Sequence, residues 1–150
     1  MAFRVFLVFG VSVFIGCGKP EPNRATLLKT VETLQTSLAK KDIVAELKLM
    51  LIPEGAPIEK LKKALTSDGM AENLSAEGVK HLVAKAKFGK LAALFPKQGA
   101  RRVERYKIPV DECYALKLKS AEVMAHWKDG KFRIFRMDDV GSKLVRQMKE

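Results

Sequence analysis

The sequence lacks an apolar run long enough to cross a bilayer. A transmembrane helix needs about 20 consecutive apolar residues, and the longest run, from Val5 to Gly16, is only about a dozen residues long. From Lys19 onward the sequence is polar and contains prolines. We therefore expect no membrane-spanning helix in the mature chain.

The sequence also lacks the motifs of metal, phosphate and nucleophile sites. Its two histidines, His81 and His126, lie far apart, and neither a Cys-x-x-Cys nor a His-x-x-x-His spacing occurs. No glycine-rich phosphate loop and no nucleophile-elbow motif is present. These absences predict no bound metal ion, no cofactor and no catalytic residue of a recognisable type.

Acidic residues are few relative to basic ones. The chain of 150 residues has 17 Asp and Glu against 28 Lys and Arg, which gives a formal net charge of +11. Such an excess attracts anionic lipid head groups, acidic polymers or nucleic acid, although a solvated lysine-rich surface has the same composition. Nucleic acid is disfavoured, because the lysines are scattered and only 7% of the residues are aromatic. An anionic surface or a protein is the expected partner.

The N-terminus has the three parts of a secretory signal: a charged start, a short apolar centre and small residues at its end. Within it, Phe14-Ile15-Gly16-Cys17 resembles the lipobox of bacterial lipoproteins. The resemblance implies that residues 1–16 are removed and that Cys17 becomes the first mature residue, with a diacylglycerol on its thiol and usually a third acyl chain on its amine. The alternative is ordinary cleavage beside Cys17, which would release a soluble protein.

Acylation of Cys17 would fix the location of the whole chain. Two or more acyl chains give stable anchoring to membrane lipid, and residues 17–23, with Pro20 and Pro22, form a short, stiffened tether. We expect a cell-envelope protein, in the outer membrane where one exists and otherwise on the outer face of the cytoplasmic membrane. A secreted or periplasmic soluble protein is the alternative. With Cys17 acylated, Cys113 has no disulfide partner in its own chain.

The first part of the mature sequence has the periodicity of amphipathic helices. The residues suited to open a helix are Asn23, Asp42, Pro57 and Ser75. The last of these helices is expected to break or kink at Gly89 and to end at Pro96.

After Gly99 the periodicity changes to two, as expected of strands. Asp129-Gly130 is the strongest hairpin signal, because a type I′ turn needs positive φ at both positions. A second, weaker turn is expected at Lys119-Ser120, and residues 101–108 are predicted to form a further strand. The predicted cross-strand pairs are Trp127–Phe132, Ala125–Ile134, Val123–Arg136, Leu118–Ala121, Leu116–Val123 and Tyr114–Ala125.

These elements predict a single α+β domain over residues 24–138, with helices packed on one face of a C-terminal antiparallel sheet, and a tail over residues 139–150. The break at AKKD, the helix ending LMLIP and the hairpin AEVMAHWKDGKFRIFRM resemble the nuclear-transport-factor-two-like (cystatin-like) fold. The resemblance implies a cone-shaped pocket between a curved sheet and its helices, in which some members use an aspartate, histidine or tyrosine as acid or base.

The predicted registers also place candidate site residues on the second face of the sheet. Cys113 falls opposite His126, which falls opposite Arg133. A thiol beside an imidazole is the arrangement that activates a nucleophilic cysteine. Tyr114, on the first face, is of a type that the pocket of the resembling fold would need. Chance pairing of a small apolar residue with a surface histidine is the simpler interpretation. The apolar side chains on this face are Ala115, Met124, Phe135 and Met137, either as a contact surface or under the chain's own helices.

Two functional hypotheses follow. The favoured one is a membrane-anchored lipoprotein with a small, non-catalytic binding or scaffolding domain. The alternative is a small pocket enzyme, of hydrolase or isomerase type, that uses His126 with Cys113 or an acidic residue. Neither hypothesis names a ligand.

Overall fold

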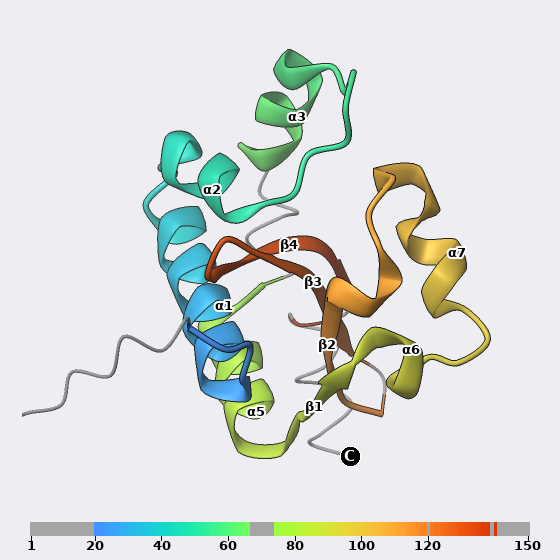
Figure 1. Ribbon diagram of the computed structural model, residues 1–150. Helices are drawn as coiled ribbons and strands as arrows, with labels where there is room; N and C mark the ends of the chain where they lie inside the picture. Colours follow the sequence, from blue (N-terminus) through green and yellow to red (C-terminus); the bar gives the residue numbers. More distant parts are fainter. Residues whose placement is uncertain (1–19, 67–73, 120, 139, 141–150) are drawn as a thin grey trace, which may run out of the picture.

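The structure of the protein, a computed structural model, describes residues 20–66, 74–119, 121–138 and 140. The described part is an α+β fold, with helices in the N-terminal half and an antiparallel sheet at the C-terminal end (Figure 1). The fold class predicted from the change of periodicity is therefore confirmed. No helix within these ranges is long and apolar enough to cross a membrane.

The first helix, α1 (Arg24–Ala39), begins at the expected cap. The Asn23 side chain accepts a hydrogen bond of 2.9 Å from the Thr26 backbone N–H. One face of the helix is buried through Leu27, Leu28, Val31, Leu34 and Leu38. The Arg24 guanidinium donates to carbonyl oxygens at the C-terminal end of α5 (Ala76–Lys85). These bonds satisfy carbonyls that a helix end leaves unpaired and tie α1 to α5.

The other expected helix starts are also present. Asp42 caps α2 (Ile43–Leu49), and Ser75 caps α5, each by accepting a hydrogen bond from a backbone N–H in the first turn. Pro57 directly precedes α3 (Ile58–Leu65). Local chemistry therefore sets where these helices begin.

The sheet is an antiparallel meander in the described part of the chain. Its strands, in spatial order, are β1 (Lys87–Lys90), β2 (Cys113–Lys117), β3 (Glu122–Lys128) and β4 (Lys131–Asp138). The hairpin between β3 and β4 turns at Asp129 and Gly130, whose φ angles are 52° and 75°. Both are positive, as the predicted type I′ turn requires.

Most of the predicted register is confirmed. The observed pairs include Trp127–Phe132, Ala125–Ile134, Leu116–Val123 and Tyr114–Ala125. At the turn between β2 and β3, the Leu118 N–H donates to the Ala121 carbonyl oxygen at 2.8 Å. The alternation of apolar residues was sufficient to align these strands, because a shift of one residue would exchange the two faces.

The predicted pair of Val123 with Arg136 is wrong. The register shifts between Met124 and Ala125, so that Val123 pairs with Met137 and Met124 pairs with Arg136. A β-bulge places an extra residue on one strand and bends it. Nothing in the turn chemistry signals such an insertion in the middle of a strand.

Helices cover both faces of the sheet, whereas the sequence predicted helices on one face only. On the first face, α1 and α5 pack over Leu116, Val123, Ala125, Phe132 and Ile134. On the second face, α6 (Leu91–Leu94) and α7 (Gly99–Val103) pack over Cys113, Ala115, Met124 and Phe135. The chain's own helices therefore account for the apolar residues of the second face, apart from Met137, which packs against the first core.

Two predicted elements are wrong. Residues 101–108 form no strand; they belong to α7, to the 3-10 helix η1 (Glu104–Tyr106) and to the loop that follows. The segment around Gly89 is no kinked helix but strand β1, which pairs with β2. Whether so short a segment becomes a strand depends on the partner strand beside it, because β propensity is set largely by context.

The core continues past the predicted end of the domain at residue 138. Val140 is fully buried and forms an isolated parallel bridge with Leu74. Gly78 of α5 lies against this segment, where a Cβ atom would overlap the Val140 carbonyl oxygen. Residues 141–150 of the predicted tail lie outside the described residues, as do the predicted signal and Cys17.

Gly78→Ala should destabilise the fold. The added methyl group would force α5 or the Val140 segment to move, and overpacking of this kind costs about 1–3 kcal/mol. Gly89→Ala is the matched control, because its methyl group would meet only the Leu94 side chain, at ordinary contact distance. Urea unfolding followed by circular dichroism measures both variants. Equal stability of the two would contradict the close approach of Val140.

Glu46 is a buried carboxyl group on the inner side of α2. It is 1% exposed, and neither carboxylate oxygen has a hydrogen-bond partner among the residues that the structure describes. Burial, assisted by the Asp42 carboxylate, raises the pKa of Glu46 above its ordinary value of 4.5. The folded state therefore holds this proton more tightly than the unfolded chain, so stability falls as pH rises from about 4.5 through the folded-state pKa.

Glu46→Met should raise the free energy of unfolding at pH 7. The variant removes a buried, unpaired group that costs at least about 1 kcal/mol when it ionises, and it keeps a similar side-chain volume. The gain should shrink toward pH 4, below the ordinary pKa of 4.5, where Glu46 is mostly protonated in the unfolded state as well. Urea unfolding at both pH values tests this expectation, and a gain of equal size at the two would contradict it.

Candidate anion-binding site

A hollow of about 530 Å³ opens at the end of the sheet where β2 turns into β3. The connection between α6 and α7 forms one wall, and the strand ends form the other. Four cationic side chains and two carboxylates line it: Lys97, Arg102, Lys117, Lys119, Glu122 and Asp138. Its apolar floor includes Leu94, Phe95 and Leu118.

A second hollow of about 460 Å³ adjoins the first. The two share Leu94, Lys117, Leu118 and Lys119. The second adds Lys85, at the end of α5, and Lys87, at the start of β1, and has no acidic residue in its lining. We call the two hollows together the basic groove.

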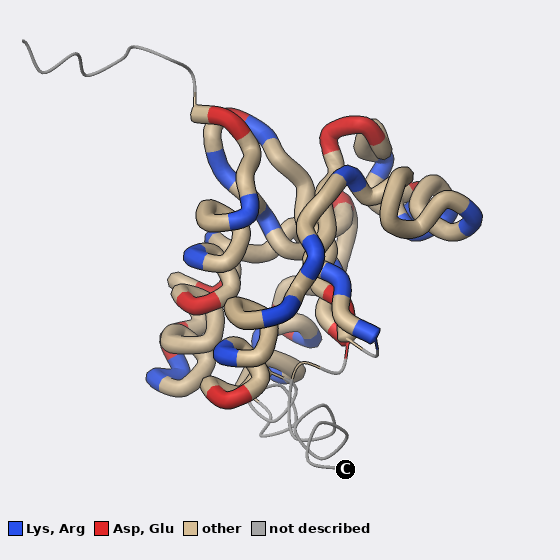
Figure 2. Tube along the Cα trace, turned by 90° about the horizontal axis from the view of Figure 1, so that it is seen from below, with Lys and Arg blue, Asp and Glu red and all other residues tan. Residues whose placement is uncertain are grey.

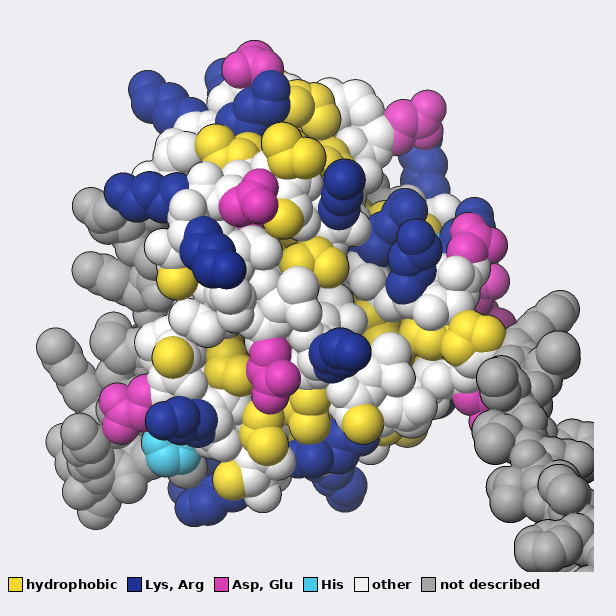
Figure 3. Space-filling model, turned by 90° about the vertical axis from the view of Figure 1, so that its left-hand side faces the viewer, with side chains coloured by type: hydrophobic (Ala, Val, Ile, Leu, Met, Phe, Trp, Pro, Cys, Tyr) yellow, Lys and Arg dark blue, Asp and Glu magenta, His cyan; other side chains and the backbone are white. Residues whose placement is uncertain are grey.

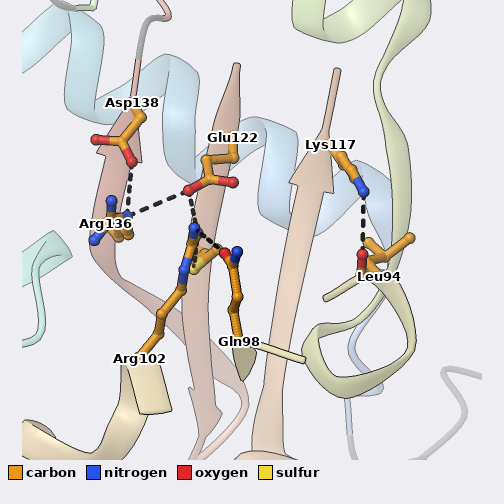
Figure 4. Close-up of polar contacts among 8 residues, drawn as sticks. Leu94, Gln98, Arg102, Lys117, Glu122, Arg136 and Asp138 are labelled. Carbon is orange, nitrogen blue, oxygen red and sulfur yellow. Dashed lines mark hydrogen bonds and ion pairs between the residues drawn. The ribbon is translucent and has the colours of Figure 1, made fainter. Parts of the chain in front are cut away.

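The carboxylates of the basic groove are already engaged by arginines (Figure 4). Glu122 forms ion pairs with Arg102 and, at 3.3 Å, with Arg136, which also lies 2.7 Å from Asp138. Arg102 further donates to the Gln98 side chain at 2.7 Å. The Glu122 and Arg102 side chains are only 15% and 20% exposed. This cluster neutralises itself and holds α7 against β3.

The lysines of the basic groove have no such partners. Within the described ranges, no carboxylate lies within 4.0 Å of the amino groups of Lys85, Lys87, Lys97, Lys117 or Lys119. All five are exposed. The Lys117 amino group donates instead to the Leu94 carbonyl oxygen at 3.1 Å (Figure 4). The groove therefore presents positive charge that the described chain does not balance.

Lys87 and Lys117 oppose each other directly across the β1–β2 ladder. Like charges in this position destabilise a sheet. Glu122 is the cross-strand partner of Lys117 on its other side, but its carboxylate is held by Arg102 and Arg136. A bound anion would relieve the repulsion that remains between the two lysines.

The Phe95 ring supports two of the cations. The Lys117 amino nitrogen lies 4.7 Å from its centroid, and the Arg102 guanidinium carbon lies 5.1 Å from it. Both distances are in the range of cation–π contacts. The ring holds the cations over an apolar floor, where a contact with an anion is less screened than in open water.

Lysine number alone does not distinguish the basic groove. Basic residues are spread over most of the elements (Figure 2), and among the described lysines Lys62 alone forms an ion pair with a described carboxylate. The groove stands out because five of its lysines gather around two adjoining hollows beside the Phe95 ring. The side of the molecule in Figure 3 shows hydrophobic side chains only in small, separate groups among charged ones. The large hydrophobic residues most exposed in the described chain, Val44, Ile58 and Val83, belong to three different helices. That distribution does not favour an apolar docking surface.

Cys113 and His126 are cross-strand partners, as the register predicted. Both lie in the interior, with exposures of 0% and 5%. The His126 Nε2 atom is 2.7 Å from a carboxylate oxygen of Glu112, and the Cys113 thiol donates to the Pro109 carbonyl oxygen at 3.4 Å. The surrounding protein therefore leaves little room for a substrate at either side chain.

The protonation of Cys113 also argues against a nucleophilic role. Burial raises the pKa of its thiol to about 12, the carboxylates of Glu112 and Asp111 add to the rise, and Lys90 opposes it. The thiolate is the nucleophilic form of cysteine. At neutral pH this residue is a thiol that packs as a small apolar side chain.

The two remaining candidates lie apart from that pair. Tyr114 points to the first face of the sheet, where its ring stacks on Phe88 at 5.6 Å and the Lys90 amino group lies 4.5 Å above it. Arg133 is the cross-strand partner of His126 and is exposed. The candidate residues thus form no common pocket.

The basic groove was not predicted from the sequence. Its formation depends on β1, which brings Lys87 beside Lys117, and on the helical path of residues 91–103, which carries Phe95 over the strand ends. The sequence predicted a helix for the segment that forms β1. The only available signal was the excess of lysine over acidic residues.

Comparison with known proteins identifies no relative: no family model, no curated protein and no solved structure matches the chain. Within the described ranges, no group of three or more His, Cys, Asp or Glu residues is arranged to hold a metal ion. The resemblances to bacterial lipoproteins and to the nuclear-transport-factor-two-like fold stay predictions.

Cys113 should resist alkylation in the folded protein. Iodoacetamide reacts with the thiolate, and a buried thiol with a pKa of about 12 supplies almost none at pH 8. Peptide mass spectrometry, which reads this cysteine separately from Cys17, should find it unmodified in buffer and fully modified in urea. Rapid modification of the native protein would contradict the interior position of the thiol.

Proposed function

We propose that the protein is a membrane-anchored lipoprotein of the cell envelope whose folded domain binds an anionic ligand in the basic groove and catalyses no reaction. The observation that carries the proposal is the gathering of five exposed lysines around two adjoining hollows, beside the Phe95 ring. Phosphate, sulfate and carboxylate groups are the chemistry that such a set recognises.

The arrangement of the groove favours binding over a purely solvated surface. Lys87 and Lys117 repel each other without an anion between them, while the nearby arginines are already paired with Glu122 and Asp138. An anion that contacts both lysines gains attraction and removes repulsion.

Two observations support a role without catalysis. The Cys113 thiol is protonated at neutral pH because its pKa is about 12, and the His126 ring is 5% exposed and engaged by Glu112. A general base must reach the proton that it removes. Neither side chain has the access that a pocket enzyme would need.

The proposal of a lipid anchor is based on the sequence from Phe14 to Cys17 and on the short segment that separates Cys17 from the fold. Residues 17–23 connect Cys17 to the capped start of α1 at Asn23. Because an extended chain spans at most about 3.6 Å per residue, the domain would stay within a few tens of ångströms of the membrane. A tethered binding domain is the simplest use of such a connection.

Lipidation predicts a defined N-terminus for the mature protein. After expression of the full chain in a bacterium that processes lipoproteins, mass spectrometry should find Cys17 as the first residue, with its mass raised by two or three acyl chains. Cys17→Ser should leave residues 1–16 attached and the protein unacylated. A mature terminus that begins beyond Cys17 without lipid would refute the anchor.

If the groove binds an anion, substitutions of single lysines should weaken anion binding to unequal extents. In calorimetric titration with tripolyphosphate, Lys117→Gln should weaken binding by roughly three- to tenfold, since it removes one charge-assisted contact. Lys128→Gln, an exposed lysine at the other end of β3, is the matched control and should change Kd less than about twofold. Equal losses in the two variants would show attraction to net charge without a site.

A further inference from the structure

The tether and the basic groove lie at opposite ends of the sheet. Pro20, the first described residue, packs beside the β3–β4 hairpin, where it lines a hollow with Trp127, Asp129 and Gly130. The groove lies at the other end of β3, beside Glu122. In Figure 1 the β3–β4 hairpin lies beside α1, whereas the turn between β2 and β3 is at the other end of the sheet, next to α6.

The separation can be estimated from the covalent geometry. β3 extends from Glu122 to Lys128, and a rise of about 3.3 Å per residue gives roughly 20 Å between the groove and the hairpin. Cys17 precedes Pro20 by three residues, so an anchor at Cys17 is separated from Pro20 by at most about 11 Å of chain. The anchored end of the domain therefore faces the lipid, and the groove faces away from it.

At that distance the anchoring membrane attracts the groove only weakly. The Debye length is about 8 Å at physiological ionic strength, and the surface potential of anionic lipids decays over that length. Roughly 20 Å corresponds to more than two Debye lengths. Head groups of the anchoring leaflet are thus poor candidates for the ligand.

The shape of the groove indicates an extended ligand. Its two hollows join through Leu94, Lys117 and Lys119, with Lys85 at one end and Lys97 at the other. The lysines come from α5, β1, β2 and the α6–α7 connection, so a ligand that contacts all of them must extend over both hollows. A chain of regularly spaced anionic groups can contact them in sequence.

We infer that the basic groove binds a linear acidic polymer, with repeated phosphate or carboxylate groups, that lies outside the membrane in which the protein is anchored. This inference rests on the proposed function and adds to it the form of the ligand and the side from which it approaches. The protein then links the membrane at its hairpin end to the polymer at its groove end.

The test uses the full chain, processed and reconstituted through its anchor into vesicles of phosphatidylcholine alone or with 30% phosphatidylglycerol. The probes are fluorescent polyphosphate of about 60 units and fluorescent polygalacturonate, with inorganic phosphate as the monomeric comparison. Polymer binding to the vesicles is measured in 0.15 M salt. We expect at least one polymer to bind at least about 100-fold more tightly than inorganic phosphate, because linked contacts raise the effective concentration.

A matched pair of double variants locates the binding. Lys87→Gln with Lys117→Gln changes the lysine pair of the groove, and Lys128→Gln with Lys131→Gln changes a cross-strand lysine pair beside the hairpin. The first should weaken polymer binding at least about tenfold and reduce the salt dependence of log Kd by roughly 1–2. The second, with the same loss of charge, should change Kd less than about twofold. Similar losses in both would overturn the assignment to the groove.

The two lipid compositions test the direction in which the groove faces. Polymer affinity should agree within about twofold between neutral and anionic vesicles, because the groove is beyond the reach of the surface potential. A loss of more than about fivefold on anionic vesicles would show that lipid competes for the groove, and would overturn the inference while the proposed anion binding stands. If inorganic phosphate binds as tightly as the polymers, the inference of an extended ligand is wrong. If neither polymer nor phosphate binds in neutral vesicles, the proposed function itself fails.

Discussion

The sheet of this protein is apolar on both faces, and the rest of the structure depends on that constraint. In β2, the side chains of Cys113 and Ala115 are buried on one side, while Leu116 is buried on the other. A sheet of this kind is stable only when both faces are removed from water. The helices that precede it cover the first face, and the short helices between β1 and β2 cover the second. The three-layer arrangement follows from the hydrophobic effect.

Covering both faces removes Cys113 and His126 from solvent and leaves the ends of the strands exposed. Cys113 and His126 meet as cross-strand partners, but they do so beneath the second helical layer. The polar ends of the strands remain in contact with solvent, and there the α6–α7 connection passes close enough for Phe95 to meet Lys117. Lysines that the sequence scatters over separate segments are collected at this edge. Pro20 packs at the opposite edge, beside Gly130.

Features that depend on neighbouring residues in the sequence were predictable. Asn23, Asp42 and Ser75 cap helices because each side chain reaches a backbone N–H within its own first turn. Asp129-Gly130 turns the hairpin because both residues tolerate positive φ. The bulge beside Met124, the pairing of β1 and the helical path of residues 101–106 were missed, because each is decided by what packs against the segment. The predicted site at Cys113 and His126 was wrong for the same reason. The register that pairs the two residues was predicted correctly, but the packing of the second helical layer, which buries them, was not.

The sequence by itself determined the fold class, the helix starts, the main hairpin and the strong positive charge. Its lipobox-like segment also predicts the point of attachment at Cys17. Only the tertiary structure decided which cations are neutralised by the described residues, since Glu122 forms ion pairs with Arg102 and Arg136 while Lys117, its partner in the ladder, has no described carboxylate within 4.0 Å. Charge balance of this kind depends on distances of a few ångströms between residues far apart in the chain, because the Coulomb energy of an exposed pair falls quickly with separation and screening.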